Sequence, residues 1–247
     1  METEFHLSSF AEFYAPISAS FIDYPSSAES LRQLLAPGGK VFELGLGTGH
    51  FASMLMDLGI TVKGIQPQDE MLVVLKKTHP EIEIVSECKL EEYEFTERHQ
   101  HIISHSSVFL FTRHVVPFGP SGETLTSYMF QSFIRDGDEV LACLQKTLRA
   151  LSPHGRLFIN TQANPSPYVS VCNGDETLTF EMTRCNYSLE SRYVEKTFRL
   201  TYKGMVYEVS DVRFCDTYRR FAQWVTEFGF KSSISSDERW IIIETHQ

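Results

Sequence analysis

The stretch Glu43-Leu44-Gly45-Leu46-Gly47-Thr48-Gly49 decides the fold class, because its glycines lie between two apolar patterns of different period. Before it, residues 41–44 form a short, mostly apolar run, which predicts a strand. After it, residues 51–58 carry apolar side chains at helical spacing and end at Gly59, which predicts a helix. Glycines let the backbone turn sharply and approach a ligand closely. Because ligands of an open α/β sheet bind beyond the carboxyl ends of its strands, we expect a ligand-binding turn here.

The chemistry of the turn indicates a ligand that carries both a carboxylate and an ammonium group. The amino terminus of the following helix offers unpaired N–H groups to an anion. Glu43, two residues before the first glycine, can pair with a cation. A dinucleotide-binding turn has the spacing G-x-G-x-x-G, and His50 stands at its last position, which disfavours a nicotinamide-dependent oxidoreductase. The remaining alternative is a βα turn of an unrelated α/β fold.

Outward from the turn, short apolar strands alternate with amphipathic helices. Strands are predicted over residues 61–66, 82–86, 101–104 and 156–160, and helices over 70–77 and 138–151. This alternation predicts βαβ units and a doubly wound, mostly parallel α/β sheet.

After residue 165 the apolar period changes from helical to two. Residues 178–182, 194–202 and 205–209 alternate, broken only by Lys196, which predicts a three-stranded antiparallel insertion. Residues 115–124 are rich in proline and glycine and predict a loop. We therefore expect one domain with an inserted antiparallel β cap.

Composition limits the partners and the compartment. The chain has 247 residues, with 22 basic and 32 acidic side chains and a formal charge of -10, which disfavours a nucleic-acid partner. No apolar run approaches the ~18 residues of a membrane span. The first residues carry acids where a signal peptide would carry Lys or Arg. Five scattered cysteines, with no CxxC pair, indicate reduced thiols. We expect a cytoplasmic protein with no nucleic-acid or membrane partner.

The glycine-rich stretch resembles motif I of the class I S-adenosylmethionine (SAM)-dependent methyltransferases. Residues 64–72, Gly-Ile-Gln-Pro-Gln-Asp-Glu-Met-Leu, are similar to that family's segment G-x-D-x-S-x-x-M-L. Residues 148–159 resemble its segment L-K-P-G-G-x-L-x-I, and Phe228-Gly229-Phe230 is similar to its A-G-F. The resemblance covers about residues 8–162 and 215–245. The insertion resembles the cap of small-molecule N-methyltransferases, such as those acting on amino sugars.

The resemblance implies a Rossmann-like sheet, SAM as cofactor, and methyl transfer to a nitrogen or oxygen of a small molecule. Residues 1–247 would form a single methyltransferase domain, with residues 1–36 as an N-terminal helical lid and 166–214 as the β-meander cap. The alternative is a SAM-binding protein of this fold that does not transfer methyl, either a cyclase-type catalyst or a pseudoenzyme. The implied cofactor-binding residues are Tyr14, Glu43, Gly45, Gly47, Gly49, Gln66, Pro67, Met71, Cys88 and Ser104.

Three positions depart from the family pattern. Gln66 replaces the acid that holds the ribose hydroxyls, with Asp69 as a possible substitute. Cys88 stands where an acid lies near the adenine, and Gln100 replaces a third acid. A neutral amide can still bond the ribose, although a neutral hydrogen bond is about half as strong as a charge-assisted one.

His105 is the candidate catalytic residue, as a general base near neutral pH. It follows the strand predicted over residues 101–104, at the ligand edge of the sheet. The alternative is a hydrogen-bonded structural histidine. His99 shares the parity of His105, but the two would lie about 20 Å apart on a strand that rises ~3.3 Å per residue. No metal site is therefore predicted.

Overall fold

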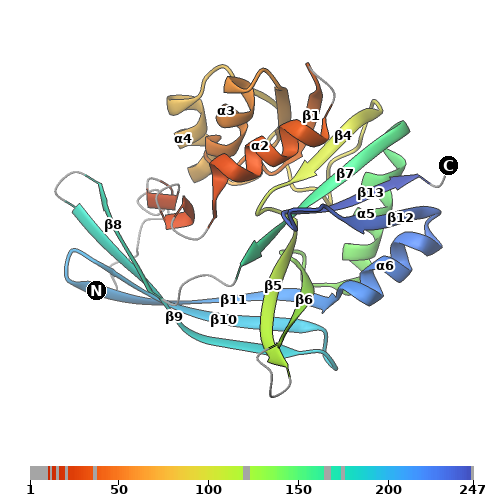
Figure 1. Ribbon diagram of the computed structural model, residues 1–247. Coiled ribbons are helices and arrows are strands. Elements are labelled where there is room, and N and C mark those ends of the chain that lie inside the picture. Colours follow the sequence, from red (N-terminus) through yellow and green to blue (C-terminus); the bar gives the residue numbers. More distant parts are fainter. Residues whose placement is uncertain are drawn as a thin grey trace.

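Two sheets that meet at strand β7 organise the computed structural model (Figure 1). The structure describes residues 11, 13–14, 17–19, 22–35, 38–118, 123–163, 168–173 and 176–245. The first sheet has the order β3-β2-β1-β4-β7, followed by β13 and β12. Its strands are β1 (Lys40–Leu44), β2 (Thr61–Ile65), β3 (Glu83–Ser86), β4 (His99–Ser104), β7 (Leu151–Ala163), β12 (Phe230–Ile234) and β13 (Trp240–Thr245).

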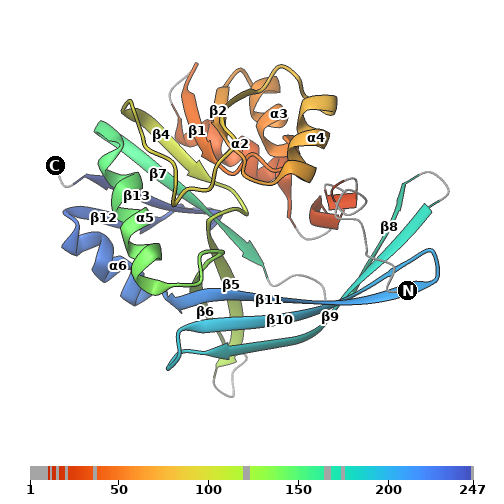
Figure 2. The ribbon, with the colours of Figure 1, turned by 180° about the vertical axis from the view of Figure 1, so that it is seen from behind.

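The first sheet is doubly wound, as the sequence predicted. Strands β1, β2, β3, β4 and β7 pair in parallel, and β13 is antiparallel to both β7 and β12. Helices cover both faces (Figure 2). They are α2 (Tyr24–Leu34), α3 (His50–Asp57), α4 (Asp69–Thr78), α5 (Gly137–Arg149) and α6 (Tyr218–Glu227).

The alternation of side chains in β1 explains the two covered faces. Phe42 and Leu44 belong to the apolar cluster that includes α5 and α6 residues such as Leu144. Val41, which precedes Phe42, belongs to the cluster that includes α2, α3 and α4 residues such as Leu55. Successive strand residues point to opposite faces, so a strand buried on both sides is apolar throughout. Glu43 is the exception, and it lies at the ligand edge.

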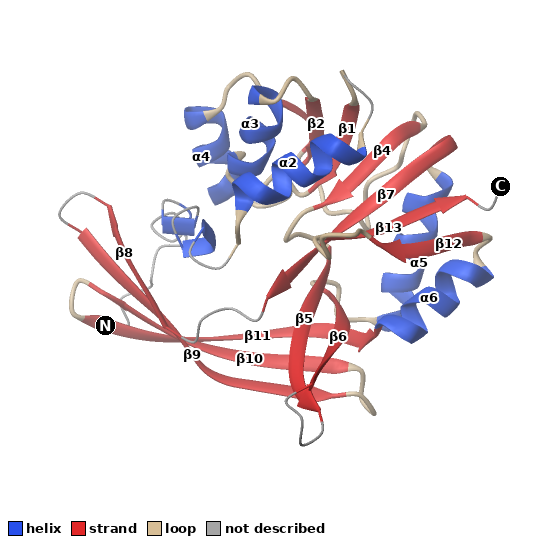
Figure 3. Ribbon diagram, viewed as in Figure 1, coloured by secondary structure: helices blue, strands red, loops and turns tan. Residues whose placement is uncertain are grey.

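The second sheet is antiparallel and continues from β7 through the order β5-β6-β11-β10-β9-β8 (Figure 3). Strand β5 joins β7 in parallel, with Phe111 opposite Thr161. The strands are β5 (Phe109–Phe118), β6 (Glu123–Ser132), β8 (Tyr168–Asn173), β9 (Glu176–Ser188), β10 (Tyr193–Tyr202) and β11 (Met205–Thr217).

Two expectations about this sheet were wrong. Most of residues 115–124 belong to the β5–β6 hairpin rather than to a loop, although 119–122 lie outside the described residues. Val115 pairs in register with Thr126, and Val116 pairs with Leu125. Valine and threonine are β-branched residues that favour strands, even beside a Pro/Gly-rich tip. The insertion also has four strands rather than three, since the short strand β8 pairs with β9.

The short helical piece before α2 lies between the second sheet and the helices of the first sheet (Figure 1). Phe13 and Ile17 are buried in a cluster with Leu178, Leu200 and Tyr202 of the second sheet. The lid expected over residues 1–36 stays a prediction, and residues 1–10, 12, 15–16, 20–21 and 36 lie outside the described ranges. No helix in the described part of the chain is long and apolar enough to span a membrane.

Candidate functional site

The glycine-rich turn follows β1 and leads into α3, and each glycine has a positive φ: 93° at Gly45, 58° at Gly47 and 83° at Gly49. A Cβ at Gly49 would overlap the side chain of Leu75, and one at Gly45 would lie 2.9 Å from the Cβ of Ser107. Among the described residues, a Cβ at Gly47 would meet only the Tyr14 ring, at 4.0 Å. The outer two glycines are therefore closed in by packing, and Gly47 presents the open side of the turn.

Hydrogen bonds tie the turn to the end of β2. The N–H groups of Gly45 and Leu46 both donate to the carbonyl of Ile65 at 3.0 Å. The N–H of Gly47 donates to Oε1 of Gln66 at 2.7 Å. Helix α3 begins after Gly49 without a side-chain cap. An uncapped helix start can offer its N–H groups to an anionic ligand, and such binding at α3 stays a prediction.

Gln66 holds the turn. Its side chain is buried, with Oε1 on Gly47 and Nε2 donating to Oε1 of Gln68 at 3.3 Å. The bond to Gly47 fixes the amide beside the open side of the turn. Its role toward a ribose remains a prediction. Pro67, half-buried, follows it, and Met71 is buried in the first turn of α4.

Glu43 carries a buried carboxyl group at the end of β1. Only 2% of the residue is exposed, and Oε2 has no hydrogen-bond partner among the described residues. Burial raises the pKa of Glu43 to about 8. A nearby cation would favour the ionised form, so this orphaned group fits the ammonium of an amino-acid ligand. The open glycine at position 47 and the uncapped α3 fit the rest of such a ligand.

His105 lies immediately after β4 within a cluster of aromatic rings. Its ring stacks on Phe51, with centroids 3.6 Å apart and planes at 8°, and Tyr24 and Trp240 lie within 6 Å. Burial, helped by the charge of His50, lowers the pKa of His105 to about 3. Its Nε2 has no partner among the described residues. His105 is therefore neutral at physiological pH, which makes it a weak base but leaves it able to form a hydrogen bond.

Ser104 and Cys88 have local partners. The hydroxyl of Ser104 donates to the carbonyl of Phe109 at 2.7 Å and accepts from the N–H of the same residue at 3.0 Å. Ser104 thus closes the loop that holds His105. Cys88 is half-buried after β3, and its Sγ accepts from the hydroxyl of Ser86 at 3.1 Å. Both residues lie at or beyond a strand's carboxyl end, the edge that also carries the glycine turn.

Sequence reasoning missed the polar contacts between the β4 loop and β7. Asn160, 1% exposed, accepts from the N–H of Ser106 at 2.7 Å. Gln162 donates to the hydroxyl of Ser106, whose φ is 55°. The sequence signal that could have indicated these contacts is Asn160, a polar residue directly after the apolar residues 157–159. These contacts fix the loop beside Gly45.

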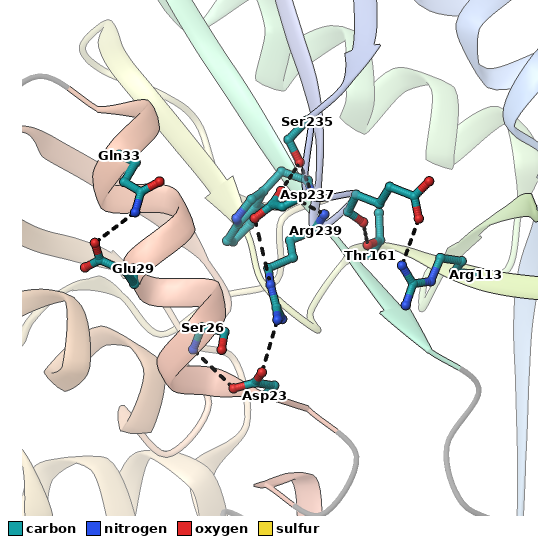
Figure 4. A network of polar contacts seen from close by, with 11 residues as sticks. Asp23, Ser26, Glu29, Gln33, Arg113, Thr161, Ser235, Asp237 and Arg239 are labelled. Atoms are coloured by element: carbon teal, nitrogen blue, oxygen red, sulfur yellow. Dashed lines mark hydrogen bonds and ion pairs between the residues drawn. The ribbon is translucent and has the colours of Figure 1, made fainter.

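A second missed network ties the N-terminal helix to the β12–β13 turn (Figure 4). Asp23 accepts from the N–H of Ser26 at 3.1 Å, capping α2, and from Arg239 at 3.1 Å. Arg113 of β5 pairs with Glu238 at 2.9 Å. The β12–β13 turn therefore joins α2, the first sheet and the second sheet.

A pocket of 540 Å³ opens between the first turns of α2 and α3. Its lining includes Asp23, Tyr24, His50 and Met54 but none of the turn glycines. His50 of this lining follows Gly49 and begins α3, so the pocket adjoins the glycine turn.

The strand order, the antiparallel β13 and the glycine turn after β1 define the fold of the class I SAM-dependent methyltransferases. No family model matches the sequence, and no curated protein matches it. Several solved structures share the fold. KedS8, a sugar N-methyltransferase from Streptoalloteichus sp, is 11% identical, with a TM-score of 0.65 over 96% of this chain and 93% of that chain.

Two further structures have similar scores. CalS10, an amino pentose methyltransferase from Micromonospora echinaspora solved with SAM bound, is 12% identical, with a TM-score of 0.64 over 95% of this chain and 96% of that chain. DesVI from Streptomyces venezuelae is 14% identical, with a TM-score of 0.63 over 99% of this chain and 100% of that chain. At these identities the similarity is one of fold.

Proposed function

We propose that this protein is a SAM-dependent methyltransferase that acts on a nitrogen or oxygen of a small molecule. The observation that carries the proposal is the buried, unpartnered carboxyl of Glu43 beside the open glycine turn. An orphaned carboxyl group in the interior costs free energy unless a ligand pairs with it. In this fold, the ligand with a matching ammonium group is SAM.

Different residues of the chain would each bind a different part of SAM. Glu43 would pair with the ammonium group and the amino terminus of α3 with the carboxylate. Gln66 would donate to the ribose, with Pro67, Met71 and Cys88 along the same edge. Tyr14 would cover the ligand from the lid side, since its ring lies over Gly47. SAM supplies an electrophilic methyl carbon.

Most of the rate enhancement would come from positioning. Holding a nucleophile in line with an electrophilic carbon can contribute about 7–11 kcal/mol. The lid and the second sheet would exclude water from the space between them, which strengthens electrostatic interactions there. His105 would contribute a hydrogen bond from its neutral imidazole.

The acceptor is proposed to be an amine, with a hydroxyl as the second choice. KedS8 and CalS10 are described as a sugar N-methyltransferase and an amino pentose methyltransferase. The strands β8–β11 would form the cap over this acceptor, and we place the protein in the cytoplasm, with no nucleic-acid or membrane partner.

Titration calorimetry with SAM tests the cofactor assignment. We expect wild type to bind and Gly47→Val to lose binding, because a β-branched residue is strained at a φ of 58°. Leu58→Val, outside the turn, is the matched control and should bind like wild type. Equal binding by Gly47→Val, or binding of a nicotinamide dinucleotide instead, would refute the assignment.

The second candidate function is SAM binding without methyl transfer. The observation that favours it is the engagement of Gln66 by Gly47 and Gln68, where the family has an acid free to bind the ribose. SAM binding without labelling of any amine or phenol in a broad panel would support this candidate.

A further inference from the structure

Lys196 is a buried lysine on the inner face of the second sheet. It lies in the middle of β10 and is 6% exposed, between the equally buried Val194 and Leu200 on the same face. Lysine is almost never fully buried unless it is paired. The residue that interrupts the apolar alternation of the sequence therefore needs a reason for its position.

The amine of Lys196 reaches across a neighbouring strand. Its Nζ donates to Oε1 of Gln131 at 3.0 Å. Gln131 lies on β6, and β11 stands between β6 and β10 in the sheet. The side chain thus runs over β11 toward β5 and β7, the strands that lead to the first sheet. With strands ~4.8 Å apart and with β5 and β6 between β11 and β7, an amine over β11 lies about 14 Å from β7 along the sheet.

Gln131 is fixed by its other contacts. It is fully buried, and its Nε2 donates to the hydroxyls of Thr112 at 2.7 Å and Tyr187 at 3.2 Å. Because Lys196 donates and an amide nitrogen cannot accept, Oε1 faces Lys196 and Nε2 faces the two hydroxyls. The partner of the lysine is therefore a neutral acceptor held in one orientation.

The charges around Lys196 offset only part of the cost of burying its ammonium form. Among the described residues, no carboxylate lies within ion-pair distance of its amine, and the nearby Asp211 is paired with Arg213 at 2.6 Å. Burial and then the charge of Arg213 lower the pKa of Lys196 to about 8. The other titratable groups facing it are Cys185 and Tyr187 of β9, Cys215 of β11 and His114 of β5.

A continuous set of contacts connects Lys196 with the glycine turn. Thr112, bonded to Gln131, lies opposite Gln162 of β7, and Gln162 donates to Ser106 in the loop after β4. On the lid side, Tyr14 lies over Gly47. Burial raises the pKa of Tyr14, and the nearby charge of Arg213 offsets part of that rise. Lys196 shares a strand face with Leu200 and Tyr202, which pack against the N-terminal segment, so its amine lies on the lid side of the cap.

We propose that Nζ of Lys196 is the proton acceptor for the amine or hydroxyl that is methylated. The inference rests on the proposed function and adds a catalytic residue to it. The acceptor's N–H or O–H bond breaks, its electron pair stays on the nitrogen or oxygen as the nucleophile, and the proton forms a new N–H bond on Lys196. The resulting ammonium keeps its bond to Gln131 and returns the proton to water after release of the product.

Gln131 is the positioning residue of this pair. A carboxylate at position 131 would favour the charged lysine and raise its pKa, whereas a neutral amide accepts one N–H without adding a charge. Gln131→Glu preserves shape, because Thr112 and Tyr187 can donate their hydroxyls to a carboxylate. It is therefore the variant that changes the basicity of the lysine with the least structural change.

The test combines a direct titration with a pH profile. Labelled lysine in the full chain, with the Lys196 signal identified by its loss in Lys196→Met, is titrated by NMR without ligand. Methyl transfer from SAM is then followed against pH with the acceptor that an amine and amino-sugar panel yields. We expect Lys196 to titrate near 8 and kcat/KM to rise to a plateau through the same pH. In Gln131→Glu both midpoints should move upward together by at least one unit.

The variants at position 196 complete the test. Lys196→Met should lower kcat by about 10²–10⁴-fold with unchanged SAM affinity, and Lys196→Arg should do the same, because arginine does not give up its proton. Lys203→Met, an exposed lysine at the tip of the same hairpin, is the control. A lysine that titrates near 10, a pH profile that does not follow Gln131→Glu, or full activity in Lys196→Arg would overturn the inference. Absence of SAM binding by wild type would instead refute the proposed function.

Discussion

Replacing Glu43 by glutamine separates a ligand-binding carboxyl group from a structural one. Glu43 has a pKa of about 8 in the folded chain, against an ordinary value of 4.5. Between these values the folded state binds more protons than the unfolded state, so the stability contributed by this group is present below pH 4.5 and is lost as pH rises to 8. At pH 7 the loss is about 3 kcal/mol, taking 1.36 kcal/mol per pKa unit.

Glu43→Gln has nearly the same shape and does not titrate, so it should be more stable than wild type at neutral pH in the absence of ligand. Urea unfolding at pH 5, 7 and 8 measures the difference, which should grow from about 1 to about 4 kcal/mol. Glu92→Gln, an exposed glutamate, should show no such growth. If Glu43→Gln is less stable than wild type at pH 8, Glu43 is ionised and paired in the free protein, and the argument fails.

The same variant should bind SAM more weakly. In wild type, pairing with the ammonium of SAM ionises Glu43, so binding at pH 7 should release about 0.9 proton. The affinity for SAM should therefore increase about tenfold for each unit by which the pH rises toward 8. Calorimetry in buffers of different ionisation enthalpy measures this release, which should disappear in Glu43→Gln. Proton release that persists in the variant would assign it to another group.

The remaining predictions concern the ribose, the imidazole and the cap. Gln66→Glu keeps an oxygen for the Gly47 N–H and offers a second one to the ribose, so calorimetry should show SAM binding tightened several-fold, by about 1 kcal/mol; unchanged affinity would mean that the ribose is held elsewhere. His105→Phe preserves stacking and removes one neutral hydrogen bond, so turnover should fall about tenfold at constant SAM affinity; a loss of 10²-fold or more would make His105 the base. Hydrogen exchange with a methyl acceptor bound should show protection within residues 170–214, and protection confined to residues 41–110 would contradict the cap.

The glycine turn carried most of what the sequence could predict. Its strand-turn-helix context, the parallel strands and the helix that became α5 follow from local periodicity, which survives folding unchanged. The β5–β6 hairpin could not be predicted from local periodicity, because the Pro/Gly-rich residues at its tip obscure the strand pattern on either side. Strand pairing across β7 and β5 is a long-range contact that no local pattern encodes.

The sequence predicted which residues form the candidate site better than it predicted what each of them contacts. Glu43 and Gly47 were identified from spacing alone, but the missing partner of Glu43 is a property of packing. Gln66 was recognised as a departure from the family, yet its bond to Gly47 depends on how β2 ends beside the turn. Lys196 appeared only as an interruption of an apolar pattern, because its partner Gln131 is 65 residues away.

Transfer of an isotope-labelled methyl group from SAM tests the central claim most directly. The full chain is incubated with methyl-labelled SAM and a panel of small amines, amino sugars and phenols, and the products are resolved by mass spectrometry. We predict label on a nitrogen or oxygen of at least one acceptor, with an equal amount of S-adenosylhomocysteine, and neither product with Gly47→Val. Saturating SAM binding without label on any acceptor would contradict methyl transfer and leave the non-transferring candidate in its place.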